Sequence, residues 1–191
     1  ERIFNAAKTF NADVIMTDSD LPNGTARCEQ AAEKFNQRFD AVINIQGDEP
    51  LLDPLMIDEV AELLNNSYCA TLCNEMRDDF ENPNAVKVVM SNDNYALYFS
   101  RSLIPYQRNK NYDIKIYQHI GIYGYDFEFL KKYVTLVPTP LSEAESLEQL
   151  KILEHGYKIK IKITDSKIKS LGVDTPEDLE KVREIIKNGR V

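Results

Sequence analysis

A short apolar segment followed by a glycine and two acids constrains the fold of this chain more than any other feature. Residues 40–46 (DAVINIQ) form an almost uninterrupted apolar and β-branched run. Such runs are typical of strands covered on both faces, as in parallel sheets. Gly47 follows and lets the backbone turn, and Asp48 and Glu49 come next. We therefore expect a buried strand whose C-terminal end carries two carboxylates.

Strand-like and helix-like segments alternate around this run. Further strands are expected at residues 12–16, 68–73, 116–125 and 158–163, with a hairpin formed by residues 85–90 and 95–100. Helices are expected at residues 25–35, 54–64, 142–155 and 175–187. The opening residues 1–8 also have helical spacing. This order predicts one α/β domain over residues 1–191, with a mostly parallel mixed sheet.

Capping residues support three of these helices. Asp53 is a predicted N-cap, because a proline follows it at the first helical position. Ser142 with Glu145, and Thr175 with Asp178, have the spacing of capping boxes.

Charge and cysteine content exclude several classes of protein. The formal net charge is −8, which argues against sequence-blind binding of nucleic acid. No apolar run reaches the length of about 18 residues that a membrane span needs. Cys28, Cys69 and Cys73 lack metal-site spacing, so we expect reduced thiols in a cytoplasmic protein.

Two aspartates follow strand-like or apolar segments and are candidate metal ligands. Asp48 comes directly after the buried run, and Asp174 ends the segment 171–174 just before the last helix. Hard carboxylate oxygens of this kind suit Mg²⁺, which also binds substrate phosphates. The alternatives are a solvated acidic loop at Asp48 and a helix-terminus charge at Asp174.

Other polar residues could line a ligand pocket. The start of the helix at Gly24, Thr25 and Arg27 could meet a phosphate or a sugar hydroxyl, although an ordinary turn and cap would look the same. His119 shares a strand face with Tyr123, with a glycine between them that leaves room for a ligand; a core histidine is the alternative.

Glu148 and Gln149 are expected in mid-helix, where they would line one edge of a pocket or form a solvated face.

Several longer runs, in order along the chain, carry a resemblance to a known family. They are residues 44–51 (NIQGDEPL), 82–89 (NPNAVKVV), 95–105 (YALYFSRSLIP), 119–125 (HIGIYGY), 147–150 (LEQL) and 172–180 (GVDTPEDLE). With these runs the chain resembles the 3-deoxy-manno-octulosonate (Kdo) cytidylyltransferases, also called CMP-Kdo synthetases. It departs from the family's pattern at Ala26, where an acid is usual, and at Gln118, where arginine is common.

The resemblance implies a Rossmann-like nucleotidyltransferase fold and a homodimer. It implies transfer of CMP from CTP to Kdo, for lipopolysaccharide or capsule synthesis. Asp48 and Asp174 would hold Mg²⁺, and Gln46 would join Gly24, Thr25 and Arg27 along the nucleotide and sugar site. The sugar pocket would consist of Arg101, His119, Tyr123, Glu148 and Gln149.

The family's first strand and its basic triphosphate-binding loop have no match in residues 1–20. We therefore expect that these parts are missing from the chain. Two alternatives stay open: a cytidylyltransferase for a related 3-deoxy sugar acid, and an inactive fragment that serves as a binding or dimerisation scaffold.

Overall fold

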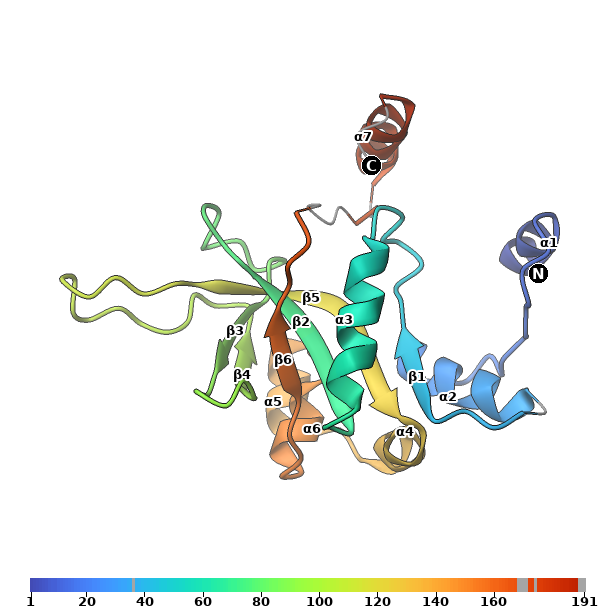
Figure 1. Ribbon diagram of the computed structural model, residues 1–191, viewed down its shortest axis with the longest axis horizontal. Helices are drawn as coiled ribbons and strands as arrows, with labels where there is room; N and C mark the ends of the chain where they lie inside the picture. Colours follow the sequence, from blue (N-terminus) through green and yellow to red (C-terminus); the bar gives the residue numbers. More distant parts are fainter. Residues whose placement is uncertain (36, 168–171, 174, 189–191) are drawn as a thin grey trace.

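The structure is a computed structural model that describes residues 1–35, 37–167, 172–173 and 175–188. Helices and strands are mixed along the chain, as Figure 1 shows. The helices are α1 (Arg2–Lys8), α2 (Gly24–Lys34), α3 (Pro54–Leu64), α4 (Phe127–Thr135), α5 (Pro140–Glu145), α6 (Leu150–Glu154) and α7 (Pro176–Lys187). The strands are β1 (Ala41–Asn44), β2 (Cys69–Glu75), β3 (Lys87–Met90), β4 (Ala96–Ser100), β5 (Tyr117–Asp126) and β6 (Lys160–Ile163).

The long strand β5 organises the sheet. It pairs with β2 along one edge, from Tyr117 opposite Glu75 to Tyr125 opposite Cys69. Its other edge is shared, because β1 pairs with the C-terminal half of β5 and β3 pairs with its N-terminal end. The strand order is β4-β3-β5-β2-β6, with β1 attached to β5.

The predicted α/β nucleotidyltransferase fold is confirmed, but the expectation of a mostly parallel sheet is wrong. Strand β5 is antiparallel to each of its three partners, and β3 is antiparallel to β4. Among the described strands only β2 and β6 pair in parallel. The apolar run does form strand β1, but the expected burial on both faces is wrong, because Ala41 is exposed, Val42 and Ile43 are half-buried and only Asn44 is buried. An apolar run also does not report the direction of the neighbouring strand.

Two layers of helices cover the sheet and give it two cores (Figure 1). On one face α3 packs Met56 and Val60 against Ala70, Leu72 and Ile122. The core on the other face is larger and aromatic, and receives side chains from α4 and α6. Its most buried members include Phe99, Tyr125, Leu130, Tyr133 and Ile152. Residues of β5 enter both cores, so β5 fixes the spacing between the layers.

Three local predictions are wrong. Residues 12–16 form no strand and have no partner strand within the described part of the chain. The helix expected at residues 142–155 is broken into α5 and α6, because Ser146 has a left-handed backbone with φ 51°. Its capping box is formed by Thr139 and Ser142 instead of Ser142 and Glu145.

Helix α4 was not predicted, although Asp126 accepts a hydrogen bond from the backbone N–H of Phe129 as its N-cap.

Other boundaries agree with the sequence. Helix α3 covers residues 54–64 as expected, with the Asp53 carboxylate accepting from the backbone N–H of Leu55. Thr175 and Asp178 form the predicted capping box of α7. Helices α1 and α7 stand away from the sheet (Figure 1), and α1 has no buried residue. None of the described helices is long and apolar enough to cross a membrane.

Gly124 lets α3 approach the sheet closely, and this contact generates a prediction. A Cβ at position 124 would lie 2.5 Å from Val60 Cγ1 and 2.9 Å from Leu64 Cδ1. We expect Gly124→Ala to lower the free energy of unfolding by about 1–3 kcal/mol, since the core must shift to admit it. Denaturant unfolding measures the change. Gly121→Ala is the matched control on the same strand, because its Cβ would meet only Gln46 Cγ at 3.6 Å. Equal stability of Gly124→Ala and the parent chain would contradict the account.

Candidate active site

The site is built around a break in the pairing along one edge of β5. Strand β1 ends where Asn44 lies opposite Tyr123, and β3 begins where Lys87 lies opposite Gln118. Between them Gly121 faces the half-buried side chain of Gln46. The chain that leaves β1 therefore turns away at this point.

Asp48 lies in the turn that follows β1 and is exposed. Its backbone carbonyl accepts a hydrogen bond of 2.8 Å from the N–H of Val173. Two segments far apart in the sequence are thus held side by side. Asp174 itself lies outside the described residues, so its predicted pairing with Asp48 stays a prediction.

The carboxylate oxygens at this turn are ligands that suit a divalent cation such as Mg²⁺. Asp48 offers an exposed carboxylate, and the Glu49 carboxylate oxygen lies 3.8 Å from the position that a Cβ would take on Gly172. Hard oxygen donors on a solvent-accessible turn are the ligands that Mg²⁺ prefers. No group of three His, Cys, Asp or Glu side chains lies close enough to bind a metal in the described ranges. A cation here would therefore need ligands beyond the protein residues described.

Glu148 lies between the start of α2 and helix α4. Its two carboxylate oxygens accept hydrogen bonds from Thr25 Oγ1 at 3.1 Å and from Tyr133 Oη at 2.9 Å. Glu148 is not in mid-helix as expected, because the left-handed turn at Ser146 ends α5 before it. The turn between α5 and α6 therefore presents this carboxylate, and the next residue, Gln149, is buried.

Thr25 and its neighbours join this cluster from the α2 side. Asn23 caps α2 by accepting from the backbone N–H of Ala26. Thr25 is fully buried, and its hydroxyl oxygen accepts from Asn44 Nδ2 at 3.4 Å. Gly24 lies close to the same amide group, 3.9 Å from it at the position of a Cβ. The predicted segment 24–25 is thus brought to Glu148, with its threonine side chain turned inward.

Arg27 has a different set of contacts. Its guanidinium donates to Thr17 Oγ1 at 3.0 Å and to the backbone carbonyl of Asp18 at 2.8 Å. It also reaches the carbonyls of Ser19 and Leu21. In this structure Arg27 therefore holds the loop before α2 in place, which is a role the sequence did not suggest.

Arg101 follows β4 and supports the turn that carries Glu148. Its Nε donates to the carbonyl of Glu145 at 2.7 Å, and Nη2 reaches the carbonyl of Ser146 at 3.3 Å. Nη1 donates to the carbonyl of Pro83 at 3.0 Å. Arg101 thus fixes the left-handed turn, beside the sugar-pocket role predicted for it.

Lys87 also stabilises these loops, through hydrogen bonds to backbone carbonyls. It is fully buried, and Nζ donates to the carbonyls of Asn82 at 2.8 Å and Arg101 at 2.6 Å. Burial lowers the pKa of this ammonium, although nearby acids oppose the effect. No pattern in the sequence predicted the burial of Lys87.

His119 and Tyr123 lie on one face of β5, as predicted, with ring centroids 5.1 Å apart. The His119 Nε2 lies 3.0 Å from Thr71 Oγ1, and the Thr71 hydroxyl lies 2.7 Å from the carbonyl of Ile122. Since this hydroxyl has one proton and donates to the carbonyl, Nε2 is the donor and Nδ1 is the acceptor. Burial lowers the pKa of His119 to about 3, so the ring is neutral.

Tyr123 is buried, and its hydroxyl has no hydrogen-bond partner among the residues that the structure describes. Burial, followed by the charge of Glu148, raises the pKa of Tyr123 well above its usual range, so the phenol stays protonated. A buried hydroxyl without a partner is costly, and a ligand hydroxyl or carboxylate would supply one.

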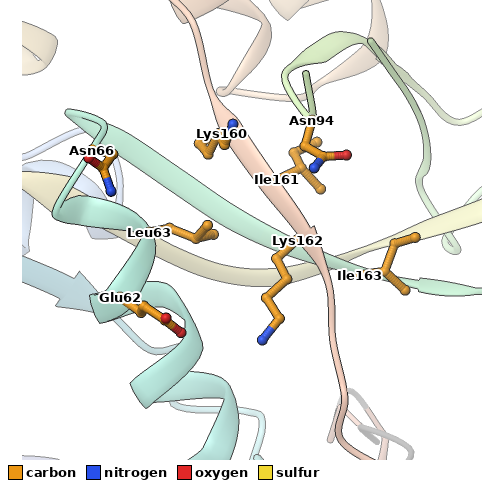
Figure 2. Close-up of a pocket in the computed structure, with 8 residues that line it drawn as sticks. All are labelled: Glu62, Leu63, Asn66, Asn94, Lys160, Ile161, Lys162 and Ile163. Atoms are coloured by element: carbon orange, nitrogen blue, oxygen red, sulfur yellow. The ribbon is translucent and has the colours of Figure 1, made fainter. Parts of the chain in front are cut away.

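The groove between α3 and β6 lies apart from these residues. Figure 2 shows that its lining includes Leu63, Asn66, Lys160 and Lys162, and its volume is about 500 Å³. Both lysines are already engaged: Lys160 Nζ donates to the carbonyl of Asp93, and Lys162 pairs with the buried Glu59. This groove therefore contains none of the candidate catalytic or sugar-binding residues.

The family described as Cytidylyltransferase matches residues 1–163. A 3-deoxy-manno-octulosonate cytidylyltransferase of Fusobacterium nucleatum is 45% identical over 196 residues, covering 100% of this chain and 78% of the relative. The mitochondrial enzyme of that name from Arabidopsis thaliana is 45% identical over 193 residues, covering 98% of this chain. The chain spans 66% of the Arabidopsis relative.

A solved structure agrees with these relatives. It is described as CMP:2-keto-3-deoxy-manno-octonic acid synthetase complexed with CTP. It has a TM-score of 0.90 and 35% identity, and the match covers 98% of this chain and 78% of that one. The chain belongs to the 3-deoxy-manno-octulosonate cytidylyltransferase family.

The state of His119 leads to a second prediction. The unfolded imidazole takes up a proton below its ordinary pKa of 6.5, whereas the folded one does so only near 3. The unfolded state then binds more protons, so stability falls as the pH drops from 6.5 towards 3, by at most about 1.4 kcal/mol per pH unit for this group. Ring NMR at pH 5 should show a neutral His119 with its proton on Nε2.

Denaturant unfolding at pH 7 and pH 5 gives the matching test. His119→Gln should reduce the loss of stability on acidification, and His155→Gln is the control for removing an imidazole. A His119 ring that titrates near pH 6.5 would refute the assignment.

Proposed function

We propose that the protein containing this chain transfers CMP from CTP to 3-deoxy-manno-octulosonate or a close 3-deoxy sugar acid. A hydroxyl oxygen of the sugar attacks the α-phosphorus of CTP, and the bond from that phosphorus to the pyrophosphate oxygen breaks. The hydroxyl proton leaves to solvent or to a base. The observation that supports the proposal best is the Glu148 carboxylate, which hydrogen bonds from Thr25 and Tyr133 hold in place. The similarity to the family over nearly the whole chain supports it further.

The sugar is assigned to the side of the site formed by Glu148 and β5. Glu148 would accept hydrogen bonds from sugar hydroxyls, and His119 Nδ1 would accept another. The hydroxyl of Tyr123, which has no partner within the described ranges, would donate to the sugar. These contacts orient the substrate, and most of the catalysis then comes from positioning, because phosphoryl transfer needs little covalent chemistry from a protein. Arg101 and Gln149 would complete the sugar pocket, and Arg101 also supports the turn that carries Glu148.

The nucleotide is assigned to the region where α2 begins and β1 ends. Gly24 and Thr25 open α2, so their backbone N–H groups are available at a helix start. Gln46 lies across Gly121, where it can contact either substrate. Arg27 would act here by holding the loop at residues 17–21.

Asp48 and Asp174 are the proposed ligands of a magnesium ion. When bound, Mg²⁺ neutralises phosphate charge and favours attack at phosphorus. Asp48 contributes an exposed carboxylate just after β1. The hydrogen bond from the N–H of Val173 to the carbonyl of Asp48 keeps Val173, the residue before Asp174, next to Asp48.

A homodimer is part of the proposal. The segment between β4 and β5 projects from the sheet (Figure 1) and exposes Tyr106 by 86% and Tyr112 by 65%. Large exposed aromatic side chains on a projecting segment are typical of contact surfaces between subunits. We also propose a cytoplasmic location, where CTP is available, and a supply of activated sugar for lipopolysaccharide or capsule.

The metal assignment gives a third prediction. In the full-length enzyme, Asp48→Ala should reduce magnesium-dependent pyrophosphate release from CTP and Kdo at least about a thousandfold, since a catalytic metal would lose a ligand. The control is Asp40→Ala, because that aspartate is also exposed but lies at the opposite end of β1. A panel of 3-deoxy sugar acids in the same assay identifies the acceptor. Near-normal turnover by Asp48→Ala would refute the metal site.

The dimer gives a fourth prediction. Tyr106→Glu places a charge on the projecting segment and should convert the dimer to a monomer in light scattering, with Glu128→Gln on α4 as the control. A dimer that survives Tyr106→Glu would exclude this segment as the central contact.

A further inference from the structure

Glu148 is the end point of a buried chain of polar groups from three elements. Asn44 at the end of β1 donates to the Thr25 hydroxyl, which donates to Glu148 Oε1. On the other side Tyr133 of α4 donates to Glu148 Oε2 at 2.9 Å. Tyr133 is 1% exposed and Glu148 is half-buried, so this bond is partly enclosed. Both carboxylate oxygens are therefore held by a hydroxyl group.

Lys151 extends the chain behind Tyr133. Its Nζ lies 3.9 Å from the centroid of the Tyr133 ring, and the side chain is nearly buried. Its one hydrogen bond in the described structure is a long one, 3.4 Å to the carbonyl of Leu136. The ammonium thus relies on the face of the ring, and a cation over a phenol draws electron density from it and strengthens the hydroxyl as a donor.

From this geometry we infer that Tyr133, supported by Lys151, is a positioning residue that fixes the Glu148 carboxylate for the sugar substrate. The inference rests on the proposed function, which gives Glu148 to the sugar. Tyr133 does not reach the substrate itself, because it is enclosed by the aromatic core and its hydroxyl is used by Glu148. Burial, followed by the adjacent Glu148 charge, raises the pKa of Tyr133, so its hydroxyl remains a donor across the working pH range.

Thr25 and Tyr133 restrain different oxygens of one carboxylate. Loss of either bond lets the Glu148 side chain rotate, while the other bond keeps it in the site. The consequence is specific to the sugar: the nucleotide is assigned to the β1 and α2 side, so its binding does not require a fixed Glu148. A change in general stability would instead affect both substrates.

Steady-state kinetics of the full-length enzyme, with CTP and Kdo varied in turn, test the inference. Tyr133→Phe removes only the hydroxyl and should raise KM for the sugar acid about tenfold, the effect of losing one hydrogen bond to a charged group, with KM for CTP unchanged. Tyr125→Phe is the matched control, since its ring is a buried neighbour of Tyr133, with centroids 5.6 Å apart.

The same Tyr133→Phe substitution, made in an enzyme that lacks the Glu148 carboxylate, tests whether the effect acts through Glu148. In Glu148→Ala the carboxylate is gone, so adding Tyr133→Phe should change KM for the sugar acid by less than about twofold. A full tenfold effect in that background, or equal KM shifts for both substrates, would overturn the inference. So would wild-type kinetics in Tyr133→Phe.

Failure of the proposed function would look different. If the wild-type enzyme converts no 3-deoxy sugar acid, the proposed function falls, and the contact is then tested by unfolding midpoints of the same four proteins. If the shift in unfolding midpoint of the double variant differs from the sum of the Tyr133→Phe and Glu148→Ala shifts, the restraint of Glu148 is supported. If it equals that sum, the restraint is refuted.

Discussion

The pairing of β5 with three other strands is the constraint on which the rest of the structure depends. One edge of β5 is filled by β2, and the other is divided between β1 and β3. Because β1 and β3 share an edge without meeting, the chain after β1 turns out of the sheet beside Gly121. The same strand supplies Ile122 to the core under α3 and Tyr125 to the aromatic core on the opposite face. The strand that opens the site therefore also holds the two layers together.

Buried polar groups give the site its shape. The buried Lys87 and the half-buried Arg101 donate to backbone carbonyls and hold the loops after β4 and α5. Such groups are costly to bury unless each finds a partner, so they specify one arrangement of the loops. The result is a left-handed turn at Ser146 that takes Glu148 out of a helix and places it against Thr25 and Tyr133.

Sequence patterns predicted the elements better than their arrangement. The Asp53 cap and the Thr175 capping box are local signals, and both helices begin where these residues indicate. Direction of pairing is not local, so the apolar run of β1 suggested parallel neighbours where β5 is antiparallel. The break at Ser146 also escaped prediction, because no glycine marks the left-handed residue.

The sequence indicated some residues of the candidate site and missed others. Acids after a strand pointed to Asp48, and the family motifs pointed to His119 and Glu148. Tyr133 lies outside every quoted family motif, and Lys87 lies inside one that assigned it no role, so both roles follow only from burial and contact. An Asp126 N-cap followed by apolar residues at helical spacing was the signal that could have revealed α4, and with it Tyr133.

Hydrogen exchange of the full-length enzyme, followed by mass spectrometry, tests the central claim most directly. That claim is that the divided edge of β5 and the turn at Glu148 are two sides of one substrate site. With CTP, Mg²⁺ and Kdo added together, exchange should slow at residues 23–27, 44–48, 119–123 and 146–149. Unchanged exchange in these four segments, with protection confined to the groove between α3 and β6, would contradict the account.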